Sequence, residues 1–445
     1  MKHLLSSILL VLATVPLAHA TVADGVVRTK VAGIDCIVDH TSAKDVVILR
    51  GTWLAGDAFA PADNPAIATL VAGMLDKGTT QHEKFALAKV LEDLGARIQF
   101  SAGDSVNAEF SVSCLKEDLP VVLNVLAEEL RSPAFSEEEF AKYKKQLSAG
   151  IRRQTEDTGQ QADRAFVRAA YPAGHVNRLA TFDEWQKGID AATVADLKAF
   201  HAAHYGTANL TVVAAGDIDA GQFQSLLEKE FTGWVGEKAP KPAGSLSGAA
   251  KGDVAMEQTV FVPGKTSVNV VLGQASGLRY SDPDALPLRL GTGILGEGFT
   301  GRLMKQVREK EGLTYGIYAG IGSDTFSDGS WEVNATFAPA LLDKGVTSAR
   351  KVVSEFLASG VTASELAAKK TNYIGKQQVG LATTSGLAGA LLTTVQRGLP
   401  ITFLDEFPAK VDAVTLEQVN AAIKKHLSPD QLVLIKAGTV GVSTP

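Results

Sequence analysis

Strand-like and helix-like patterns of hydrophobic residues alternate along the first part of the chain. From Val26 to Leu54 apolar and polar positions alternate, in VVRTKVAGIDCIVDH and DVVILRGTWLAG, which predicts a hairpin of strands. A helical period covers Asn64 to Lys77 and His82 to Gly95. Strands are expected over Arg97 to Ala102 and Val106 to Cys114. Short strands mixed with helices in this way predict an α+β fold.

The pattern continues with more helices and one buried strand. An amphipathic helix is expected from about Glu117 to Arg131. Ser136 with Glu139 three positions later forms a capping-box motif, which predicts a long helix that runs toward Tyr171. Three elements complete this part: a helix over Thr193 to His204, a buried strand from Leu210, and a helix over Asp219 to Trp234.

The second part of the chain repeats the first. Gly236 to Asp253, GEKAPKPAGSLSGAAKGD, has no hydrophobic period and is expected to be a linker. Three pairs of motifs then recur in the same order, 220, 217 and 227 residues apart: AGML at Ala72 and TGIL at Thr292, VLEDLGARIQFSAG at Val90 and VREKEGLTYGIYAG at Val307, VNAEF at Val106 and VNATF at Val333. Their order and spacing predict an internal duplication, with α+β halves over residues 21–235 and 254–445.

The stretch from Leu295 to Tyr318, LGEGFTGRLMKQVREKEGLTYGIY, carries the candidate chemistry. A glycine-rich turn precedes an amphipathic helix, Gly312 is expected to end that helix in a left-handed conformation, and a strand follows from about Thr314. This return of helix onto strand would bring Arg308 and Tyr315 together, and a guanidinium beside a phenol can bind a carbonyl or an oxyanion. Alternatively, Arg308 and Glu311 are neighbours on an ordinary solvated helix end.

Composition and the first residues place limits on function. The 445 residues are 45% hydrophobic and 21% charged, which is typical of a globular protein of two or more domains. Residues 1–20, MKHLLSSILLVLATVPLAHA, predict a secretory signal peptide cut after Ala20, with an uncleaved anchor as the alternative. Cleavage removes Lys2 and changes the net charge from −6 to −7, so no electrostatic footprint for nucleic acid is present. No other stretch is long and apolar enough for stable membrane insertion, and the chain is expected to be periplasmic or secreted.

Export permits disulfides, but the chain has only two cysteines. Cys36 and Cys114 both lie in strand-like runs of the first half. They could form a single bridge or remain two buried thiols, and the sequence leaves both possibilities open.

The stretch around Arg308 resembles the second half of pitrilysin-type (M16 family) zinc peptidases. In that family a glycine-rich turn is followed by residues that match Gly301, Arg302 and Leu303, and then by a helix that ends in R-x-K-x-x-G-x-x-Y or close variants. The matching residues here are Arg308, Lys310, Gly312 and Tyr315, spaced as R-x-K-x-G-x-x-Y. The resemblance implies two homologous α/β-sandwich halves, each a mainly antiparallel sheet packed with helices. It also implies that Arg308 and Tyr315 are catalytic and substrate-binding residues that contact the substrate carbonyl near the scissile bond.

The zinc motif that this family carries in its first half is absent from the sequence. Active members have H-x-x-E-H on a helix, in which two histidines bind zinc and the glutamate is the general base. The run that follows the motif is present as Met74, Leu75, Lys77, Gly78 and Thr79, so the three chemical positions fall on Thr69, Ala72 and Gly73. None of these side chains can bind zinc well or accept a proton. The window of the family's third ligand, a glutamate, contains only Lys145, Gln146, Leu147, Ser148, Ala149 and Gly150.

One pair of histidines could belong to a relocated metal site. His201 and His204 lie about one helical turn apart in AFHAAHYG. No third ligand or glutamate base is evident near them in the sequence, so a structural role is the favoured interpretation.

The resemblance therefore implies a division of labour between two chains. In the family some enzymes split the zinc motif and the Arg/Tyr pair between homologous subunits, and this sequence is similar to the second kind. It predicts a chain that binds no metal itself, is inactive alone, and pairs with an H-x-x-E-H subunit that carries zinc to cleave oligopeptides. The alternative is a catalytically inert scaffold or peptide-binding protein of the same fold.

Overall fold

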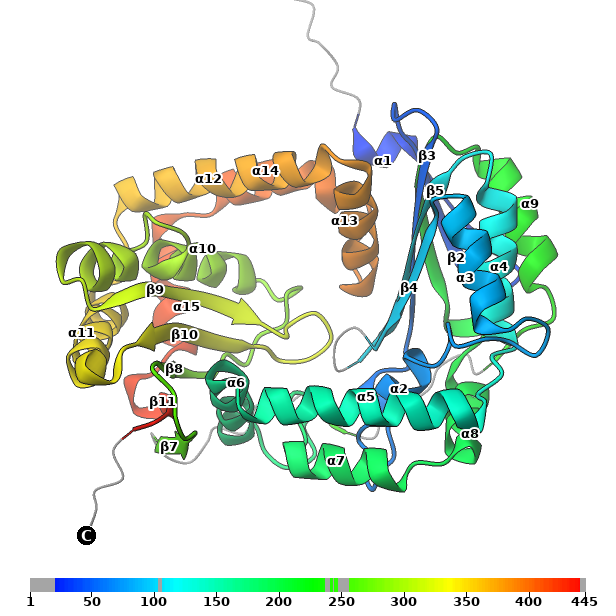
Figure 1. Ribbon diagram of the computed structural model, residues 1–445. Coiled ribbons are helices and arrows are strands. Elements are labelled where there is room, and N and C mark those ends of the chain that lie inside the picture. The colour runs from blue at the N-terminus through cyan, green and yellow to red at the C-terminus, as the bar shows by residue number, and fades with distance from the viewer. Residues whose placement is uncertain (1–20, 103–105, 237–240, 243, 247–255, 441–445) are drawn as a thin grey trace, which may run out of the picture.

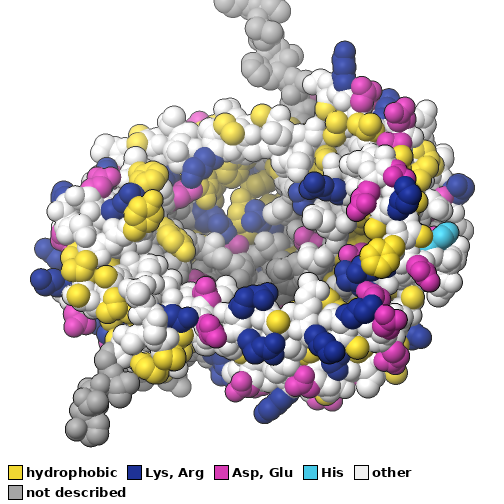
Figure 2. All heavy atoms as spheres, in the orientation of Figure 1, with side chains coloured by type: hydrophobic (Ala, Val, Ile, Leu, Met, Phe, Trp, Pro, Cys, Tyr) yellow, Lys and Arg dark blue, Asp and Glu magenta, His cyan; other side chains and the backbone are white. Residues whose placement is uncertain are grey.

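The computed structural model describes residues 21–102, 106–236, 241–242, 244–246 and 256–440. Two sheets with their helices face each other across a central hollow (Figure 1). The space-filling view shows this hollow open toward the viewer, with Lys and Arg side chains along its rim (Figure 2). The predicted signal peptide and most of the predicted linker lie outside the described residues, so these boundaries stay predictions.

The first sheet has six strands and is antiparallel except for one neighbouring pair. Its strands, in spatial order, are β1 (Val26–Val31), β2 (Ile34–His40), β6 (Thr211–Gly216), β3 (Val46–Trp53), β5 (Ala108–Leu115) and β4 (Arg97–Ser101). Only β2 and β6 run parallel. The predicted hairpin is confirmed for β1 and β2, where Ala32 and Gly33 take positive φ angles of 48° and 96°. β3 does not pair with β2, because β6 lies between them.

The second sheet repeats this plan with five strands. They are β7 (Glu257–Phe261), β11 (Val433–Gly438), β8 (Val268–Ala275), β10 (Ser330–Phe337) and β9 (Thr314–Gly322), in that spatial order. The parallel pair β7 and β11 corresponds to β2 and β6, and the antiparallel remainder corresponds strand by strand. The recurring motifs lie on corresponding elements: the first pair on the helices α2 (Ile67–Ala72) and α10 (Ala285–Gly296), the second where a helix runs into β4 and into β9, and the third on β5 and β10. The topology confirms the predicted fold class of two related α+β halves.

Helices surround both sheets. In the first half they are α1 (Val22–Gly25), α2 (Ile67–Ala72), α3 (Lys84–Asp93), α4 (Leu119–Arg131), α5 (Glu137–Thr155), α6 (Thr158–Ala170), α7 (Phe182–Ala191), α8 (Val194–His204) and α9 (Ala220–Phe231). In the second half they are α10 (Ala285–Gly296), α11 (Leu342–Ser359), α12 (Ala363–Leu381), α13 (Thr384–Gln396), α14 (Phe403–Ala413) and α15 (Leu416–His426). The single long helix predicted from Ser136 toward Tyr171 is wrong: α5 ends at Thr155, and Asp157 caps the start of α6 by accepting the Gln160 N–H.

Each sheet is covered on one face by a helix from the other half. On β2, Val38 belongs to the core under the helices of the first half, whereas Ile37 faces the opposite way and packs with Leu391 of α13. On β8, Val271 likewise packs with Phe166 of α6, on the face opposite to the core of the second half. The two halves therefore exchange helices, which the hydrophobic pattern does not reveal.

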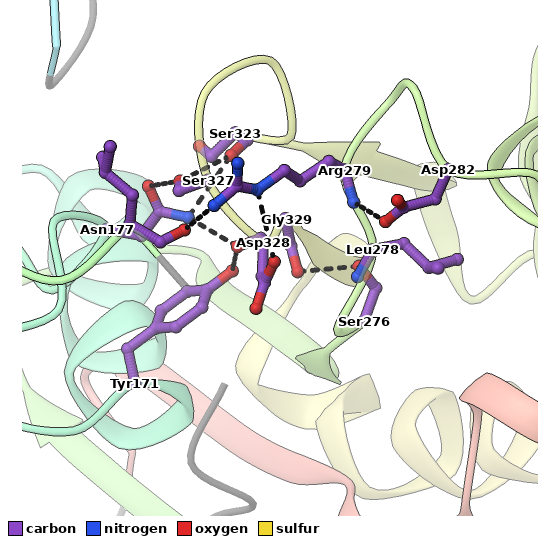
Figure 3. Close-up of polar contacts among 11 residues, drawn as sticks. Tyr171, Asn177, Ser276, Leu278, Arg279, Asp282, Ser323, Ser327, Asp328 and Gly329 are labelled. Carbon is purple, nitrogen blue, oxygen red and sulfur yellow. Dashed lines mark hydrogen bonds and ion pairs between the residues drawn. The ribbon is translucent and has the colours of Figure 1, made fainter. Parts of the chain in front are cut away.

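A hydrogen-bonded junction joins the loop after α6 to the loop between β9 and β10 (Figure 3). The Tyr171 hydroxyl and the Asn177 side-chain amide both donate to the Asp328 carbonyl, at 3.1 and 2.8 Å. The Ser327 hydroxyl donates to the Asn177 side-chain oxygen at 2.9 Å. Because these groups are buried or partly buried, the junction holds the first half against the second close to where α6 crosses over.

Both cysteines are free and buried. Cys36 lies on β2 and Cys114 on β5, with β6 and β3 between them. Three strand spacings of about 4.8 Å separate the two residues by at least roughly 14 Å, well beyond the reach of a disulfide. Of the two possibilities the structure therefore has the buried thiols, and burial raises the pKa of each to about 12. Among the described residues, no helix is both long enough and apolar enough to cross a membrane.

We predict that Leu391→Ala on α13 lowers the free energy of unfolding by about 2–5 kcal/mol, since it removes a fully buried side chain from the crossover contact. Val379→Ala on α12 is the matched control, because Val379 is 74% exposed and its loss should change that free energy by no more than about 0.5 kcal/mol. Urea unfolding followed by tryptophan fluorescence measures both. Equal losses in the two variants would contradict a structural role for the exchanged helix.

Candidate functional site

The segment that carries Arg308 is a short helix between a glycine turn and a strand. Leu303, Met304 and Val307 are buried on its inner side. Over Met304–Lys310 (η3) the helix is π-helical rather than the α-helix that the sequence predicts, and the Glu311 N–H donates to the Gln306 carbonyl five residues back, at 3.2 Å. This wider turn is a feature that hydrophobic spacing cannot distinguish from an α-helix.

Gly312 ends this helix as predicted. Its φ is +63°, and the next N–H, of Leu313, reaches back to the Val307 carbonyl at 3.0 Å. β9 then begins at Thr314, also as predicted. The register between β9 and β10 shifts between Ala335 and Phe337, next to the start of β9. Such an irregularity turns a side chain away from its regular direction, and Tyr315 lies 87% exposed.

The structure brings Arg308 and Tyr315 together. The guanidinium carbon of Arg308 lies 4.9 Å from the centre of the Tyr315 ring and 5.2 Å from the centre of the Phe299 ring. Phe299, in the glycine-rich turn, is 69% exposed and was not singled out from the sequence. The sequence feature that could have identified Phe299 is its position: a large aromatic residue in a glycine-rich turn, which is expected to be exposed. The two rings flank the guanidinium and hold it by cation–π attraction.

Arg308 makes no hydrogen bond or ion pair with any residue that the structure describes. The neighbouring Glu311 accepts from the Gln306 side chain at 2.6 Å and forms no ion pair with Arg308. The helix end is solvated, as the alternative expects, with residues 309–311 exposed. Hydrogen bonds from Ser348 and Gln306 lower the pKa of Glu311. The N–H donors of Arg308 therefore remain available to a ligand.

Arg302 in the same segment shows the contrast. Its Nε and Nη2 both donate to Glu365, each at 2.7 Å, in a bidentate pair. This guanidinium lowers the pKa of Glu365 to about 2, and Glu365 also completes the capping box of α12 with Thr362. Arg302 thus stabilises the fold through its ion pair with Glu365, whereas Arg308 has no such pair among the described residues.

One position of the missing zinc motif is occupied by a neighbouring side chain. Thr69 and Ala72 lie on α2, and Gly73 caps its C-terminal end. A side chain at Gly73 would overlap the hydroxyl and ring of Tyr143 from α5. Tyr143 is partly buried there, and desolvation raises the pKa of its phenol. The described residues contain no group of three His, Cys, Asp or Glu side chains that could hold a metal ion. A metal ligand at Gly73 therefore does not fit this packing.

His201 and His204 do not converge on one point. His201 is buried, its Nε2 lies 2.8 Å from the Leu130 carbonyl, and its ring stacks on Tyr205. Burial lowers its pKa, so the neutral form is favoured. The ring of His204 instead packs between Phe59 and Phe200. These contacts support the structural interpretation of the pair.

Family models match most of the chain. The model described as "Insulinase (Peptidase family M16)" matches residues 38–180, and the one described as "Peptidase M16 inactive domain" matches residues 191–373. The chain belongs to the M16 peptidase family.

Relatives of the chain include one named as a non-peptidase and others named as zinc proteases. The chain is 23% identical over 409 residues to the "Non-peptidase homolog YmxG" of Helicobacter pylori, covering 90% of this chain and 91% of that protein. It is 22% identical over 359 residues to the "Uncharacterized zinc protease SCO5738" of Streptomyces coelicolor, covering 80% and 76%.

Solved structures show the same architecture. The M16 inactive domain from Pseudomonas fluorescens matches with a TM-score of 0.81 and 26% identity, over 94% of this chain and 100% of that one. The periplasmic protease PqqL of Escherichia coli matches with a TM-score of 0.76 and 16% identity, over 94% of this chain and 45% of that one. The second likeness is one of fold alone.

We predict that Gly73→Ala lowers the free energy of unfolding by about 1–3 kcal/mol, because the added methyl group meets the Tyr143 ring. In a Tyr143→Ala background the same change should be neutral or stabilising. Urea unfolding of the four proteins gives the interaction energy, expected at about 0.5–3 kcal/mol. An identical cost of Gly73→Ala in both backgrounds would show that Tyr143 does not fill this space.

Proposed function

We propose that this chain is the non-metal, substrate-binding subunit of a heterodimeric zinc metallopeptidase that cleaves oligopeptides. A homologous partner with an intact H-x-x-E-H motif would carry the zinc and the glutamate base, and this chain would contribute Arg308 and Tyr315 in trans. The observation that carries the proposal is Arg308, a guanidinium held between two exposed rings with no ion pair or hydrogen bond to the described residues.

The chemistry of this pair suits a developing oxyanion. Arg308 offers several N–H donors, and the exposed Tyr315, whose ring centre lies 4.9 Å from the guanidinium carbon, offers a phenol O–H donor. When peptide hydrolysis forms a tetrahedral intermediate, its negative oxygen would accept hydrogen bonds from both groups. The aromatic faces keep the guanidinium in place before substrate arrives, so little ordering is needed during the reaction.

A second candidate function is an inert scaffold or peptide-binding protein of the same fold. The absence of zinc-binding side chains at Thr69, Ala72 and Gly73, the Tyr143 ring against Gly73, and a relative named as a non-peptidase favour it. Arg308 argues against it, since a scaffold gains nothing from a guanidinium without a partner, whereas the nearby Arg302 is fully used by Glu365.

We also propose that the mature chain works in the periplasm or outside the cell, after cleavage near Ala20. The basic start, the short apolar run and the small residues before the cleavage point support this location. The fold that the chain shares with a periplasmic protease, PqqL, is consistent with it.

The decisive assay compares this chain alone with a mixture of this chain and the H-x-x-E-H homologue of the same organism, both with added zinc. We expect hydrolysis of a quenched fluorescent peptide only in the mixture, and its loss on chelation, because only the partner has zinc ligands. Turnover by this chain alone, or no gain on mixing, would reject the in-trans subunit, and the second result would favour the scaffold.

In the active mixture, Arg308→Ala and Tyr315→Phe should each reduce kcat by a factor of about 10² to 10³, the usual cost of losing one oxyanion donor. Tyr318→Phe is the matched control, an exposed tyrosine three residues farther along β9, and it should stay within about twofold of the unmodified complex. Pairing is checked by gel filtration, so that a loss of kcat is not confused with a loss of the partner. Unchanged turnover in both Arg308→Ala and Tyr315→Phe would remove these residues from the mechanism.

A further inference from the structure

A cavity of about 470 Å³ lies away from the Arg308 segment, where α6, the start of α7 and the edge strand β7 meet. α6 and β7 come from different halves and lie next to each other at the lower side of the molecule in Figure 1. Three arginines line this cavity: Arg164 and Arg168 from α6, and Arg178 from the loop that follows it. Positions 164 and 168 are one turn apart, so both side chains leave the same face of the helix.

Each of the three guanidiniums is fixed in place through only one of its nitrogens. In every case Nη1 makes the hydrogen bonds to protein, and Nε and Nη2 make none with the described residues. The backbone acceptors are the carbonyls of Ala180 for Arg164, Leu179 for Arg168, and Arg168 and Tyr171 for Arg178. Arg164 is held further by the face of Phe182, 4.1 Å from its guanidinium carbon. The cluster is therefore ordered in advance while most of its N–H donors stay unused.

Carboxylates accompany the three arginines. Arg168 forms an ion pair with the exposed Glu184 at 3.4 Å, and Asp183 is part of the cavity lining. Burial lowers the pKa of Arg164 despite the nearby Asp57, and burial together with the charge of Arg168 lowers the pKa of Arg178 despite Glu184. The folded protein therefore holds like charges close together, an arrangement that an incoming anion would relieve.

The opposite wall of the cavity is mostly apolar. It consists of Met256, just before β7, and of Gln258 and Val260 on the strand. Beside the arginines the lining adds the apolar Ala165 and Phe182, and its remaining side chains include Thr155, Gln161 and Thr181. The volume is several times that of a single oxyanion. A ligand that fills the cavity thus needs an anionic end and an apolar body.

We propose that this cavity binds a small molecule or chain end in which a carboxylate or phosphate group is attached to an apolar body. The anionic oxygens accept from the unused N–H groups of the three arginines, whose planar forks match such groups. The apolar body lies along Met256 and Val260. A purely structural role for the arginines accounts for their backbone contacts, but it accounts neither for three adjacent like charges nor for the open space beside them.

The experiment titrates the full mature chain with hexyl phosphate, hexanoate, hexanamide and inorganic phosphate, by calorimetry. We expect at least one of the first two to bind with a Kd of about 1 mM or lower, and at least about tenfold more tightly than the neutral hexanamide. Inorganic phosphate tests whether the apolar body contributes. Preference for hexyl phosphate or for hexanoate identifies which anionic group the site takes, and no binding of either below about 10 mM overturns the proposal.

Replacing an arginine would also release the loop, so the test variant is Gln258→Glu, whose side chain makes no hydrogen bond with the described residues. It places a negative charge opposite the guanidiniums and should weaken binding at least about tenfold. Thr259→Glu is the matched control, with the same charge on the same strand but on the opposite face, and should stay within about twofold. An equal loss in both variants would show general repulsion by the added charge and overturn the site.

Discussion

The reciprocal packing of α6 and α13 is the constraint on which the rest of the structure depends. Each central sheet has two apolar faces, and the helices of its own half bury only one of them. Ile37 and Val213 in the first sheet need Leu387 and Leu391 of α13, just as Val271 in the second sheet needs α6. Exposed apolar faces of this size would be costly in water, so neither half can complete its core without the other. This requirement sets the two sheets face to face across the hollow seen in Figure 2.

Many helices and strands could be predicted from the sequence, because the spacing of apolar residues along the chain follows the period of each helix or strand. The period of apolar residues located most strands and helices of the first half, and the recurrence of VNAEF as VNATF marked β5 and β10 as equivalent strands. The end of the helix at Gly312 was also predictable, since a left-handed residue is nearly always a glycine. What the pattern could not give is the partner of each apolar face. A stripe such as Ala162, Phe166 and Ala170 shows that a helix is buried, but not against which sheet.

The candidate site likewise has features that could be predicted from one stretch of sequence and features that depend on distant residues. Bringing Arg308 beside Tyr315 required only a helix, a glycine and a strand, all readable from one stretch of sequence. Phe299 and Tyr143 were missed because their roles depend on residues distant in sequence or on a turn without periodic signal. Tyr143 lies 70 positions after Gly73, and only the packing of α5 near α2 shows that its ring occupies the space of a side chain at position 73. The break between α5 and α6 was missed because Asp157 caps a helix within an uninterrupted polar run.

The two sides of the site differ in the space they leave for chemistry. On the zinc side, the ring of the partly buried Tyr143 occupies the space of a side chain at Gly73, so a histidine there would require Tyr143 to move. On the other side, Arg308 remains accessible and unpaired with the described residues, although Glu309 and Glu311 are its close neighbours in sequence. Phe299 and Tyr315 are both exposed and lie beside the same guanidinium, so together they form a small aromatic surface around Arg308. A ligand with a negative or strongly polar oxygen, if it bound here, would meet the donors of Arg308 and cover Phe299 and Tyr315 in the same step.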